Sequence, residues 1–338
     1  MAARGRDEAR SAPTIYDVAA EVGVAPSTVS RAFSRPGRVN SETAARIHAA
    51  AERLGYRANP LARALPTGRT SMLAMVVSDV TNPFYFQIIR GAEAAANEQD
   101  FTLLVADVLE DPAVERLALE RALPFTEGLL LGTSRMSDSA VRVIARQRPT
   151  VVLNRVVAGI PSVVTDNAKG MRRAVEHLGA LGHRSLVYVA GPEASWADGM
   201  RWQSMREAAH ELDLHVHRVG AFPPTLAGGA LAAEPVLAAR TTAVVAYNDL
   251  VAIGLLRRLR ELGVGVPEQL SVVGFDDIFG AELCTPTLTT VAAPLAALGQ
   301  YAVRLLLHES RVRTPASTRP ARLSAHLVER ESTGPAPT

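Results

Sequence analysis

Cysteine and long apolar runs are nearly missing from this chain of 338 residues. Cys284 is the single cysteine, and one cysteine cannot form an internal disulfide or a four-cysteine metal site. No apolar run reaches the roughly 18 residues of a membrane span. Residues 1–13 also lack the apolar segment of a secretory signal. These absences predict a protein of the cytoplasm, and no motif indicates a cofactor or a resident metal.

Aromatic residues make up only 5% of the chain, but the remaining composition is that of a globular protein. Hydrophobic residues account for 48% and charged residues for 21%, which argues against a disordered chain. At roughly 100–200 residues per domain, the length allows two or three domains. No period of 20–50 residues recurs, so a repeat architecture is excluded.

The two ends of the chain differ in charge. Residues 1–70 contain 11 arginines against 6 acidic residues, and the rest of the chain contains 25 basic and 28 acidic residues. A basic segment of net charge +5 therefore precedes a body of net charge −3. A solvated charged tail is one interpretation, and a surface that contacts nucleic acid is the other.

A helix-turn-helix pattern occupies the basic segment. Thr14 and Asp17 have the spacing of a capping box, and the helix that they begin ends at Gly23. Pro26 suits the first position of a second helix, which continues through Phe33. A turn this short between two helices is typical of a helix-turn-helix. An ordinary three-helix bundle is the alternative.

The second helix is the candidate recognition helix. We expect Ser41 to cap a third helix through Leu54, so that the second helix packs on two others. Short polar side chains and one arginine then face outward: Pro26, Ser27, Ser30 and Arg31. Such a face can enter the major groove of DNA, where arginine reads guanine or phosphate. On spacing alone, a merely solvated face is the alternative.

A short connector follows the three helices. Asn59 can cap a helix of one to two turns, and Pro60 can begin it, whereas Pro66 and Gly68 indicate a linker. So short a helix is marginal by itself in water. Leu65 is a large apolar residue in this polar connector. It either packs against the next domain or inserts into a minor groove as a wedge.

The body alternates short apolar runs with helical patterns. This alternation predicts parallel sheets covered by helices, and its restart after residue 165 predicts two lobes. The expected strands are residues 72–78, 101–106, 128–131, 150–153, 186–190, 243–246 and 271–275. The expected helices are residues 84–98, 112–123, 139–146, 169–181, 199–211 and 249–262.

Polar residues follow several of the expected strands, where ligands bind in open α/β sheets. These strand ends carry Ser78-Asp79, Asn154-Arg155, Gly191-Pro192-Glu193, Tyr247-Asn248-Asp249 and Asp276-Asp277. Carboxylates and guanidinium groups bind hydroxyls through charge-assisted hydrogen bonds, and aromatic faces stack on the apolar side of a sugar ring. A cleft lined in this way suits a sugar.

These motifs together resemble the lactose-repressor (LacI/GalR) family of transcriptional regulators. The segments that carry the resemblance are residues 14–19, 23–24, 27–31 and 54–59, then Asn82-Pro83-Phe84-Tyr85, Asp166-Asn167, Gly182-His183-Arg184, Asn248-Asp249, residues 273–277 and 288–291. Each fragment alone is weak, but their order and spacing over residues 14 to 330 make the resemblance specific.

The resemblance implies a homodimer that binds near-palindromic double-stranded operator DNA. It implies that Pro26 and Ser27 discriminate bases, that Arg31 contacts a base edge or phosphate, and that Asn59 to Leu65 is a hinge helix with Leu65 as its minor-groove wedge. Pro66 departs from the usual pattern of the family. The expected DNA-binding residues are Thr14, Tyr16, Pro26, Ser27, Thr28, Ser30, Arg31, Asn59 and Leu65.

For the body, the resemblance implies a periplasmic-binding-protein-like core with an effector cleft. The expected organisation is a disordered tail (1–13), a helix-turn-helix domain (14–57), a hinge and linker (58–69) and a core (70–338). The N-lobe would comprise residues 70–164 and 294–321, and the C-lobe residues 165–293 and 322–334. The fold class is therefore an all-α helix-turn-helix head plus a two-lobed α/β core.

The family also implies which residues contact the effector. The first candidates are Phe84, Arg201, Asn248 and Asp276, and the second are Asn154, Arg155, Asp166 and Trp196. Each of several candidates has a structural alternative: core packing for Phe84, an ion pair for Arg201, a turn or cap for Asp276 and a loop anchor for Trp196. Ser195 and Ala197 stand where purine-binding relatives have other residues, which weakly disfavours a purine.

Two rival functions are disfavoured by the sequence. An enzyme would need a phosphate loop, a dinucleotide-binding loop or a nucleophile elbow, and none is present. Asp276 and Asp277 are adjacent and should diverge rather than form an acid–base pair, and His215 and His217 lack a third metal ligand. A solute-binding module without a DNA role would share the core, but it would lack the basic head and carry a signal peptide.

Overall fold

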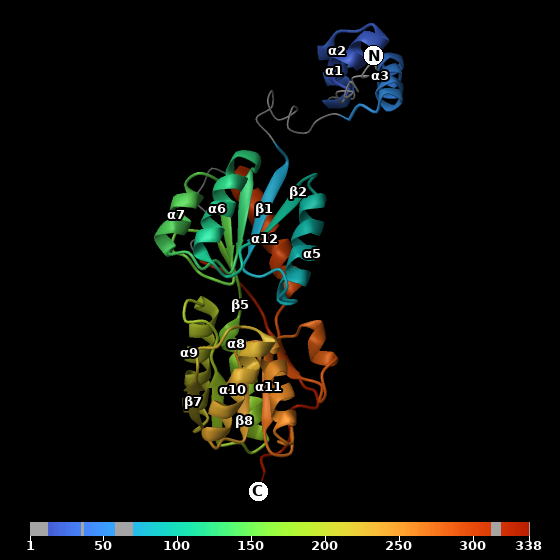
Figure 1. Ribbon diagram of the computed structural model, residues 1–338. Coiled ribbons are helices and arrows are strands. Elements are labelled where there is room, and N and C mark those ends of the chain that lie inside the picture. The colour runs from blue at the N-terminus through green and yellow to red at the C-terminus, as the bar shows by residue number, and fades with distance from the viewer. Residues whose placement is uncertain (1–12, 35–36, 58–69, 312–318, 338) are drawn as a thin grey trace, which may run out of the picture. The chain divides into compact units, whose positions relative to one another are not determined.

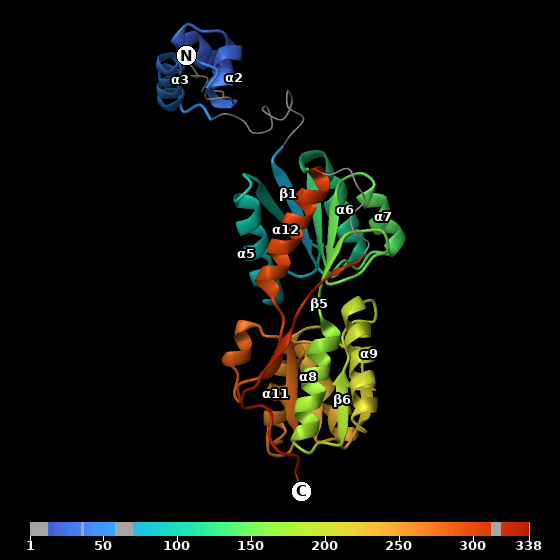
Figure 2. The same ribbon diagram turned by 180° about the vertical axis from the view of Figure 1, so that it is seen from behind.

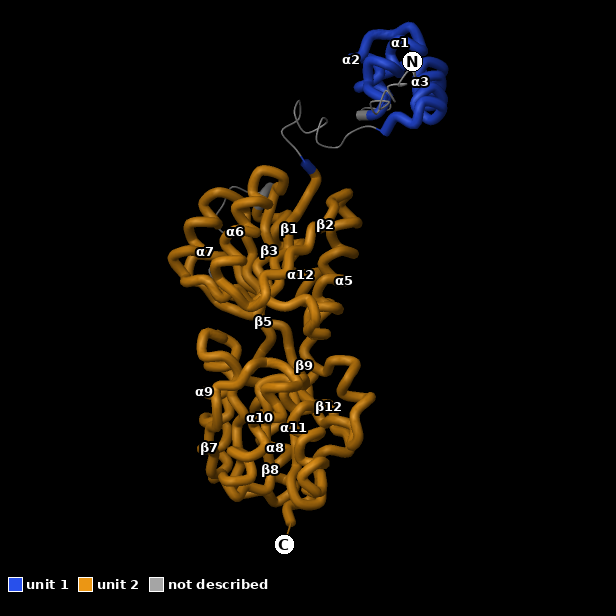
Figure 3. Tube along the Cα trace, viewed as in Figure 1, with its two compact units in different colours: residues 1–70 blue, residues 71–338 orange. Residues whose placement is uncertain are grey.

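The computed structural model describes residues 13–34, 37–57, 70–311 and 319–337. It divides the chain into two compact units, residues 1–70 and 71–338 (Figure 3). The predicted hinge, residues 58–69, and residues 1–12 of the predicted tail lie outside the described residues.

Three short helices form the first unit. They are α1 (Ile15–Val22), α2 (Pro26–Ser34) and α3 (Ser41–Leu54). The Asp17 carboxylate accepts hydrogen bonds from the Thr14 backbone N–H and hydroxyl, each at 2.7 Å, as the capping box predicted. Gly23 ends α1 with φ +72°, a left-handed conformation that favours glycine. The helix-turn-helix prediction is confirmed.

The predicted cap of the third helix is wrong by one residue. Asn40, not Ser41, is the N-cap, and its side chain accepts a hydrogen bond from the Glu42 N–H at 2.9 Å. Asparagine is among the best N-cap residues, so Asn40 takes the cap and Ser41 becomes the first helical residue. Val18, Val29 and Ile47 are fully buried where the three helices meet.

The second unit contains two parallel sheets with helices on both faces (Figure 1, Figure 2). The first sheet has the strand order β11-β5-β4-β3-β1-β2, and all of its strands run parallel. Its strands are β1 (Met72–Val77), β2 (Thr102–Asp107), β3 (Gly128–Gly132), β4 (Thr150–Leu153), β5 (Ser162–Thr165) and β11 (Ala321–Leu323).

The second sheet has the strand order β12-β10-β9-β8-β6-β7, and only the pairing of β12 with β10 is antiparallel. Its strands are β6 (Ser185–Val189), β7 (His215–Val219), β8 (Ala243–Ala246), β9 (Ser271–Asp276), β10 (Thr289–Ala292) and β12 (His326–Val328). We call the first sheet with its helices the N-lobe and the second the C-lobe.

Helices bury both faces of each sheet. In the N-lobe, α5 (Phe84–Asn97) and α12 (Leu295–Arg311) cover one face, and α6 (Pro112–Ala122) and α7 (Asp138–Ala145) cover the other. In the C-lobe, α8 (Asn167–Ala180) and α9 (Trp196–Glu211) lie opposite α10 (Leu226–Ala238) and α11 (Asp249–Glu261). Short 3-10 turns at Leu123–Phe125 and Phe279–Glu282 complete the lobes.

The chain passes between the two sheets three times. It leaves the N-lobe after β5, returns after β10 to form α12, and crosses again between β11 and β12. The predicted fold class is confirmed: a helical head precedes a two-lobed α/β core.

Each sheet reverses its strand order once. In the N-lobe the chain proceeds outward from β1 to β2 and then returns to β3 on the other side of β1. In the C-lobe the same reversal separates β7 from β8, on either side of β6. Loops at the carboxyl ends of the strands diverge at such points and leave a crevice that binds ligands.

Candidate functional site

The predicted DNA-contact residues of the head lie on its surface. Thr14, Tyr16, Ser27, Ser30 and Arg31 are exposed, and Pro26 and Thr28 are partly exposed. Val29 and Ala32 on the opposite side of α2 are buried in the head's core. The helix therefore turns its apolar side inward and its short polar side chains and arginine outward. Asn59 and Leu65 lie outside the described residues.

A small cavity lies at the strand ends where both sheets reverse their order. Both lobes contribute to its lining, which comprises Asn82, Phe84, Tyr85, Glu110, Thr133, Arg135, Asn154, Ala197, Arg201, Pro224, Tyr247, Asn248 and Asp276. Five predicted effector contacts are in this set: Phe84, Asn154, Arg201, Asn248 and Asp276.

Arg201 forms the centre of the C-lobe wall. Its Nε donates to Asn167 Oδ1 at 3.0 Å, its Nη2 donates to Asp276 Oδ1 at 3.2 Å, and its Nη1 donates to the Tyr247 carbonyl. The guanidinium carbon also lies 3.5 Å from the centroid of the Phe275 ring, a cation–π arrangement. These hydrogen bonds use three of five N–H groups, so further donors are available to a ligand.

Asp276 is held in an uncommon backbone conformation. Its φ is +116°, and Asp277 follows at +58°, a region that residues other than glycine seldom adopt. Asp276 is 4% exposed, and burial raises its pKa to about 6 although the charge of Arg201 acts to lower it. Asp277 instead pairs with Arg330 at 2.9 Å. The two carboxylates diverge as predicted.

Asp249 fixes the segment that carries Asp276. Its Oδ2 accepts from the Ile278 N–H at 2.8 Å, and its Oδ1 accepts from the Thr290 hydroxyl at 2.5 Å. Burial, with the nearby charge of Asp276, raises the pKa of Asp249 well above its usual range. A Cβ at Gly274 would lie 2.2 Å from Asp249 Oδ1. Glycine is therefore needed for this close approach.

Three other predicted contacts combine a structural role with a place in the lining. Asn248 caps α11 by accepting from the Val251 N–H at 2.9 Å. Phe84 is 6% exposed and belongs to the N-lobe core, so core packing and cavity lining both apply to it. Asn154 has φ +53° and accepts from the Thr165 hydroxyl at 3.4 Å.

The remaining predicted contacts, Arg155, Asp166 and Trp196, do not line this cavity. Arg155 donates to the carbonyls of Ser134 and Met136 and pairs with Asp138, so its guanidinium is engaged in holding a loop. The Asp166 carboxylate caps α8 by accepting from the Lys169 N–H.

Trp196 is partly buried at the start of α9, next to the lining residue Ala197. Ser195 caps this helix, and its hydroxyl lies 3.0 Å from the Tyr247 hydroxyl. The Asp198 carboxylate, one turn further along, accepts from Tyr188, Gly191 and Arg218. This end of α9 is therefore tied to the strand ends beside the cavity.

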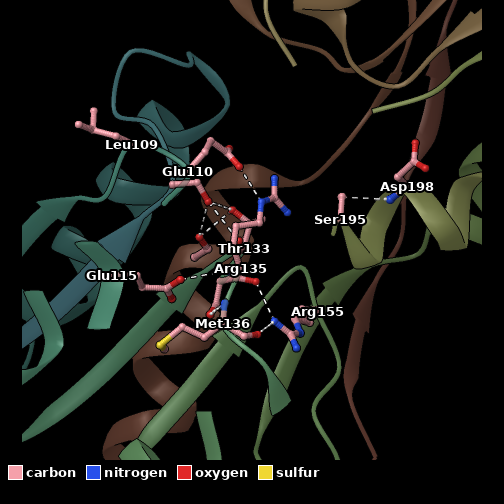
Figure 4. A network of polar contacts seen from close by, with 12 residues as sticks. Leu109, Glu110, Glu115, Thr133, Arg135, Met136, Arg155, Ser195 and Asp198 are labelled. Atoms are coloured by element: carbon pink, nitrogen blue, oxygen red, sulfur yellow. Dashed lines mark hydrogen bonds and ion pairs between the residues drawn. The ribbon is translucent and has the colours of Figure 1, made fainter. Parts of the chain in front are cut away.

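The N-lobe wall contains an ion pair that the sequence analysis missed. Arg135 Nε lies 2.6 Å from Glu110 Oε2, and both residues line the cavity. Figure 4 shows Arg135 reaching Glu110 from the loop after β3, with Glu115 and Arg155 on either side of that loop. Beside this pair, the hydroxyls of Tyr85 and Ser78 meet the Thr133 hydroxyl, and burial raises the pKa of Tyr85.

A sequence signal for this pair existed. Glu110 and Arg135 both follow expected strands, three residues after β2 and after β3. Polar residues after strand ends in open α/β sheets are candidates for ligand contact, and this rule indicates both residues.

Within the described residues, no group of three or more His, Cys, Asp or Glu side chains could hold a metal ion. His215 and His217 are exposed on the edge strand β7, as expected for surface residues. Among the same residues, no helix combines the length and the apolar character that crossing a membrane requires.

Comparison with known proteins agrees with this geometry. Residues 14–59 match the family model described as bacterial regulatory proteins, lacI family, and residues 175–333 match a periplasmic binding protein-like domain. The transcriptional regulator DegA of Bacillus subtilis (strain 168) is 31% identical over 95% of this chain and 98% of its own. The match to a DNA-binding family over the head is contrary to a solute-binding module without a DNA role.

Two solved structures resemble the whole chain. One is the Lac repressor dimer bound to operator and the anti-inducer ONPF, with a TM-score of 0.86 and 25% identity over 96% of this chain and 100% of that chain. The other is the complex of the transcriptional regulator CelR with cellobiose, with a TM-score of 0.71 and 31% identity over 95% and 99%.

Proposed function

The chain belongs to the lacI family of bacterial regulatory proteins, and we propose that it is a repressor that a sugar releases from its operator. As a member, it is a DNA-binding transcriptional regulator and not an enzyme. One observation carries the proposal of an effector: a cavity lined from both lobes by paired arginines and carboxylates beside aromatic rings.

The head supplies the proposed operator contacts. The exposed polar side of α2, with Ser27, Ser30 and Arg31, has the character of a helix that lies in the major groove. Thr14, Tyr16, Pro26 and Thr28 complete the proposed contact surface, and Asn59 and Leu65 are the proposed hinge contacts. The operator is proposed to be near-palindromic, with one half-site for each head of a homodimer, which places the protein in the cytoplasm with the DNA.

The cavity supplies the proposed effector contacts. Arg201, Asp276 and Asn248 would bind hydroxyls from the C-lobe, and Asn154 and the Phe84 ring would face the ligand from the N-lobe. A sugar fits this mixture of charged hydrogen-bonding groups and rings, and the related CelR structure contains cellobiose.

Coupling between cavity and operator would follow from a shift in population. A ligand that contacts both walls stabilises the arrangement of the lobes in which both sets of contacts form. The N-lobe begins at β1, which directly follows the linker from the head. A change in the N-lobe therefore reaches the predicted hinge, residues 58–69, along a short stretch of chain.

The N-lobe also supplies a surface for the proposed homodimer. Its edge strand β2 exposes Leu104 and Val105, and α6 exposes Val114 and Leu117. Exposed apolar side chains on an unpaired strand edge and on a helix are typical of an interface. We place the dimer interface on α6 and β2, together with the outer side of α5.

Gel shifts with DNA from upstream of the gene and its neighbours test the proposal. They are run with competitor DNA at two salt concentrations and with a panel of sugars. A specific complex that one sugar dissolves is the expected result. A specific complex that the same sugar strengthens would reverse the sign of control, and a complex that no sugar affects would contradict a sugar effector.

Arg31→Ala tests the head separately. If Arg31 reads a base, operator affinity should fall by roughly 1–3 kcal/mol, while calorimetry should show unchanged sugar binding. Arg53→Ala on α3 is the matched control, because its side chain pairs with Glu21. Equal operator affinity for Arg31→Ala and the wild type would remove Arg31 from the contact surface.

A further inference from the structure

The Glu110–Arg135 pair lines the proposed effector cavity, and the effector contacts proposed above assign neither of its residues a ligand group. Arg135 is 9% exposed and Glu110 31% exposed, and their 2.6 Å contact closes part of the N-lobe wall. The pair mirrors Arg201–Asp276 in the C-lobe wall. Each lobe therefore brings one arginine and one carboxylate to the same cavity.

The backbone is arranged to deliver Glu110 to this position. Leu109 and Glu110 have φ of +52° and +60°, two successive left-handed residues that are not glycine, which is a strained arrangement typical of functional sites. The Glu110 N–H is anchored on the Ser78 carbonyl at 2.6 Å. The loop after β2 thereby turns back toward the cavity instead of running out to solvent.

Arg135 is positioned from behind by two side chains. Its own backbone N–H donates to the buried Glu115 Oε2 at 3.0 Å. Arg155 Nη1 donates to the Ser134 carbonyl at 2.8 Å and to the Met136 carbonyl at 2.6 Å. The residues on each side of Arg135 are thus held by Arg155, and Arg135 itself by Glu115 (Figure 4).

The contacts of the pair leave hydrogen-bonding groups for a ligand. The hydrogen bond to Glu110 engages Nε of Arg135, so the terminal N–H groups are available to a ligand in the described structure. Arg155–Asp138 is a useful contrast, because it holds the same loop but lies outside the cavity lining. Because Arg155 and Asp138 already hold this loop, loop stability does not explain why the Glu110–Arg135 pair faces the cavity.

The charges of the lining cancel within each wall. Glu110 and Asp276 offset Arg135 and Arg201, and the other described lining residues carry no charge. A hydroxyl can donate to the carboxylate and accept from the guanidinium of one pair. A phosphate or carboxylate group can bind only the arginine, and it must do so against the neighbouring carboxylate.

We propose that the Glu110–Arg135 pair is a specificity determinant that makes the cavity select uncharged polyhydroxyl ligands and reject phosphorylated or acidic ones. This inference deepens the proposed function and rests on its assignment of the cavity to a sugar. Glu110 neutralises Arg135 and accepts a ligand hydroxyl, and it repels an anion. Arg135 donates to the same end of the ligand.

Glu110→Gln tests the inference, because it removes the carboxylate charge and keeps its size. Calorimetry compares glucose with glucose 6-phosphate, ribose with ribose 5-phosphate, and inorganic phosphate alone. The wild type should prefer the uncharged sugar of each pair. Glu110→Gln should shift this preference toward the phosphorylated sugar by at least about tenfold and should gain saturable binding of inorganic phosphate.

Two further variants locate the effect. Glu234→Gln changes the same charge on the exposed side of α10 and should behave as the wild type. In Glu110→Gln/Arg135→Gln the gained phosphate binding should disappear. Operator binding measured by gel shift checks that each variant is folded.

The outcomes separate the inference from the proposed function. If the wild type binds none of the sugars, the sugar assignment is weakened, and the phosphate measurement still tests the pair. If Glu110→Gln gains no phosphate binding and keeps the wild-type preference, the pair is a structural contact and the inference is wrong.

Discussion

The two ion pairs of the cavity have the same chemistry but different settings. Arg201 and Asp276 are each 6% exposed in their side chains, and Arg201 projects from the middle of α9 with further bonds to Asn167 and Tyr247. Arg135 and Glu110 belong to loops, and Glu110 is 31% exposed. The C-lobe pair is buried in the protein interior, whereas the N-lobe pair lies in the loops that follow β2 and β3.

The difference indicates separate tasks for the two lobes. A site held by a helix and several buried hydrogen bonds changes little when a ligand arrives, whereas loops open and reorganise at lower cost. We therefore regard the C-lobe wall as a preformed anchor and the N-lobe wall as the part that selects the ligand and responds to it. The N-lobe is also the lobe that begins directly after the predicted hinge, residues 58–69.

The largest expected effect comes from removing the arginine of each pair in turn. Arg201→Met leaves Asp276 buried without its partner, and such a change costs about 3–5 kcal/mol of folding free energy. Arg135→Met should cost about 1 kcal/mol, because Glu110 regains solvent. Urea unfolding measures both. Equal losses would mean that the two pairs do not differ in the way described.

The second largest effect is the pH dependence of the free energy of unfolding, to which we expect the C-lobe pair to contribute through Asp276. Burial raises the pKa of Asp276 to about 6, so the folded state keeps a proton that the unfolded state releases near pH 4. The free energy of unfolding contributed by this group therefore falls as pH rises from about 4 to 6, by up to about 3 kcal/mol. In the proposed site the ionised carboxylate would accept ligand hydroxyls, so sugar affinity should weaken below pH 6.

Asp276→Asn isolates this contribution. The contributions of the other titratable groups cancel when the free energy of unfolding of the variant is subtracted from that of the wild type at each pH. His183 is one of these, since burial lowers its pKa and its contribution to stability is lost as pH falls below about 6.5. Glu110→Gln should leave the Asp276 contribution unchanged. If the difference between wild type and Asp276→Asn does not vary from pH 4 to 7, the buried-anchor description is wrong.

We expect the smallest difference in folding free energy between alanine substitutions of one glycine in each lobe. A Cβ at Gly274 in β9 would lie 2.2 Å from Asp249 Oδ1, whereas a Cβ at Gly132 in β3 would lie 3.0 Å from the Val76 carbonyl oxygen. Gly274→Ala should cost about 2 kcal/mol and Gly132→Ala about 1 kcal/mol. Thermal unfolding monitored by circular dichroism tests the order, and a larger loss for Gly132→Ala would reverse it.

Local signals explain why the head was predictable. Thr14 and Asp17 form a cap over four residues, and Gly23 ends the helix without help from distant parts of the chain. The error at the third helix was equally local, since Asn40 and Ser41 are both good caps.

Elements that depend on distant contacts were missed. The segment that forms α10 contains Gly228, Gly229 and Pro235, all poor helix formers. A Cβ at Gly229 would lie 2.1 Å from the Val251 carbonyl oxygen, so close packing on α11 favours a helix that composition disfavours. Such tertiary contacts cannot be derived from a local pattern.

The cavity residues also divide into those that the sequence predicts and those that depend on the folded structure. Asn248 and Asp276 were indicated by strand ends and by the family resemblance, whereas Arg201, in α9, was indicated by the resemblance alone. The strand-end rule indicates Glu110 and Arg135 as polar residues, but their pairing depends on left-handed backbone at Leu109 and Glu110, which that rule does not predict. Arg155 was misplaced because its guanidinium turns to the carbonyls of Ser134 and Met136, a choice that only the folded loop defines.

Hydrogen exchange with and without the sugar identified by the gel shifts tests the central claim most directly. The anchor description predicts that α9 and residues 274–278 are already protected in the free protein and change little. It predicts that the loops at residues 108–111 and 133–137 gain protection when the sugar binds. Gains confined to the C-lobe segments, with both N-lobe loops unchanged, would contradict the assignment of anchor and responder.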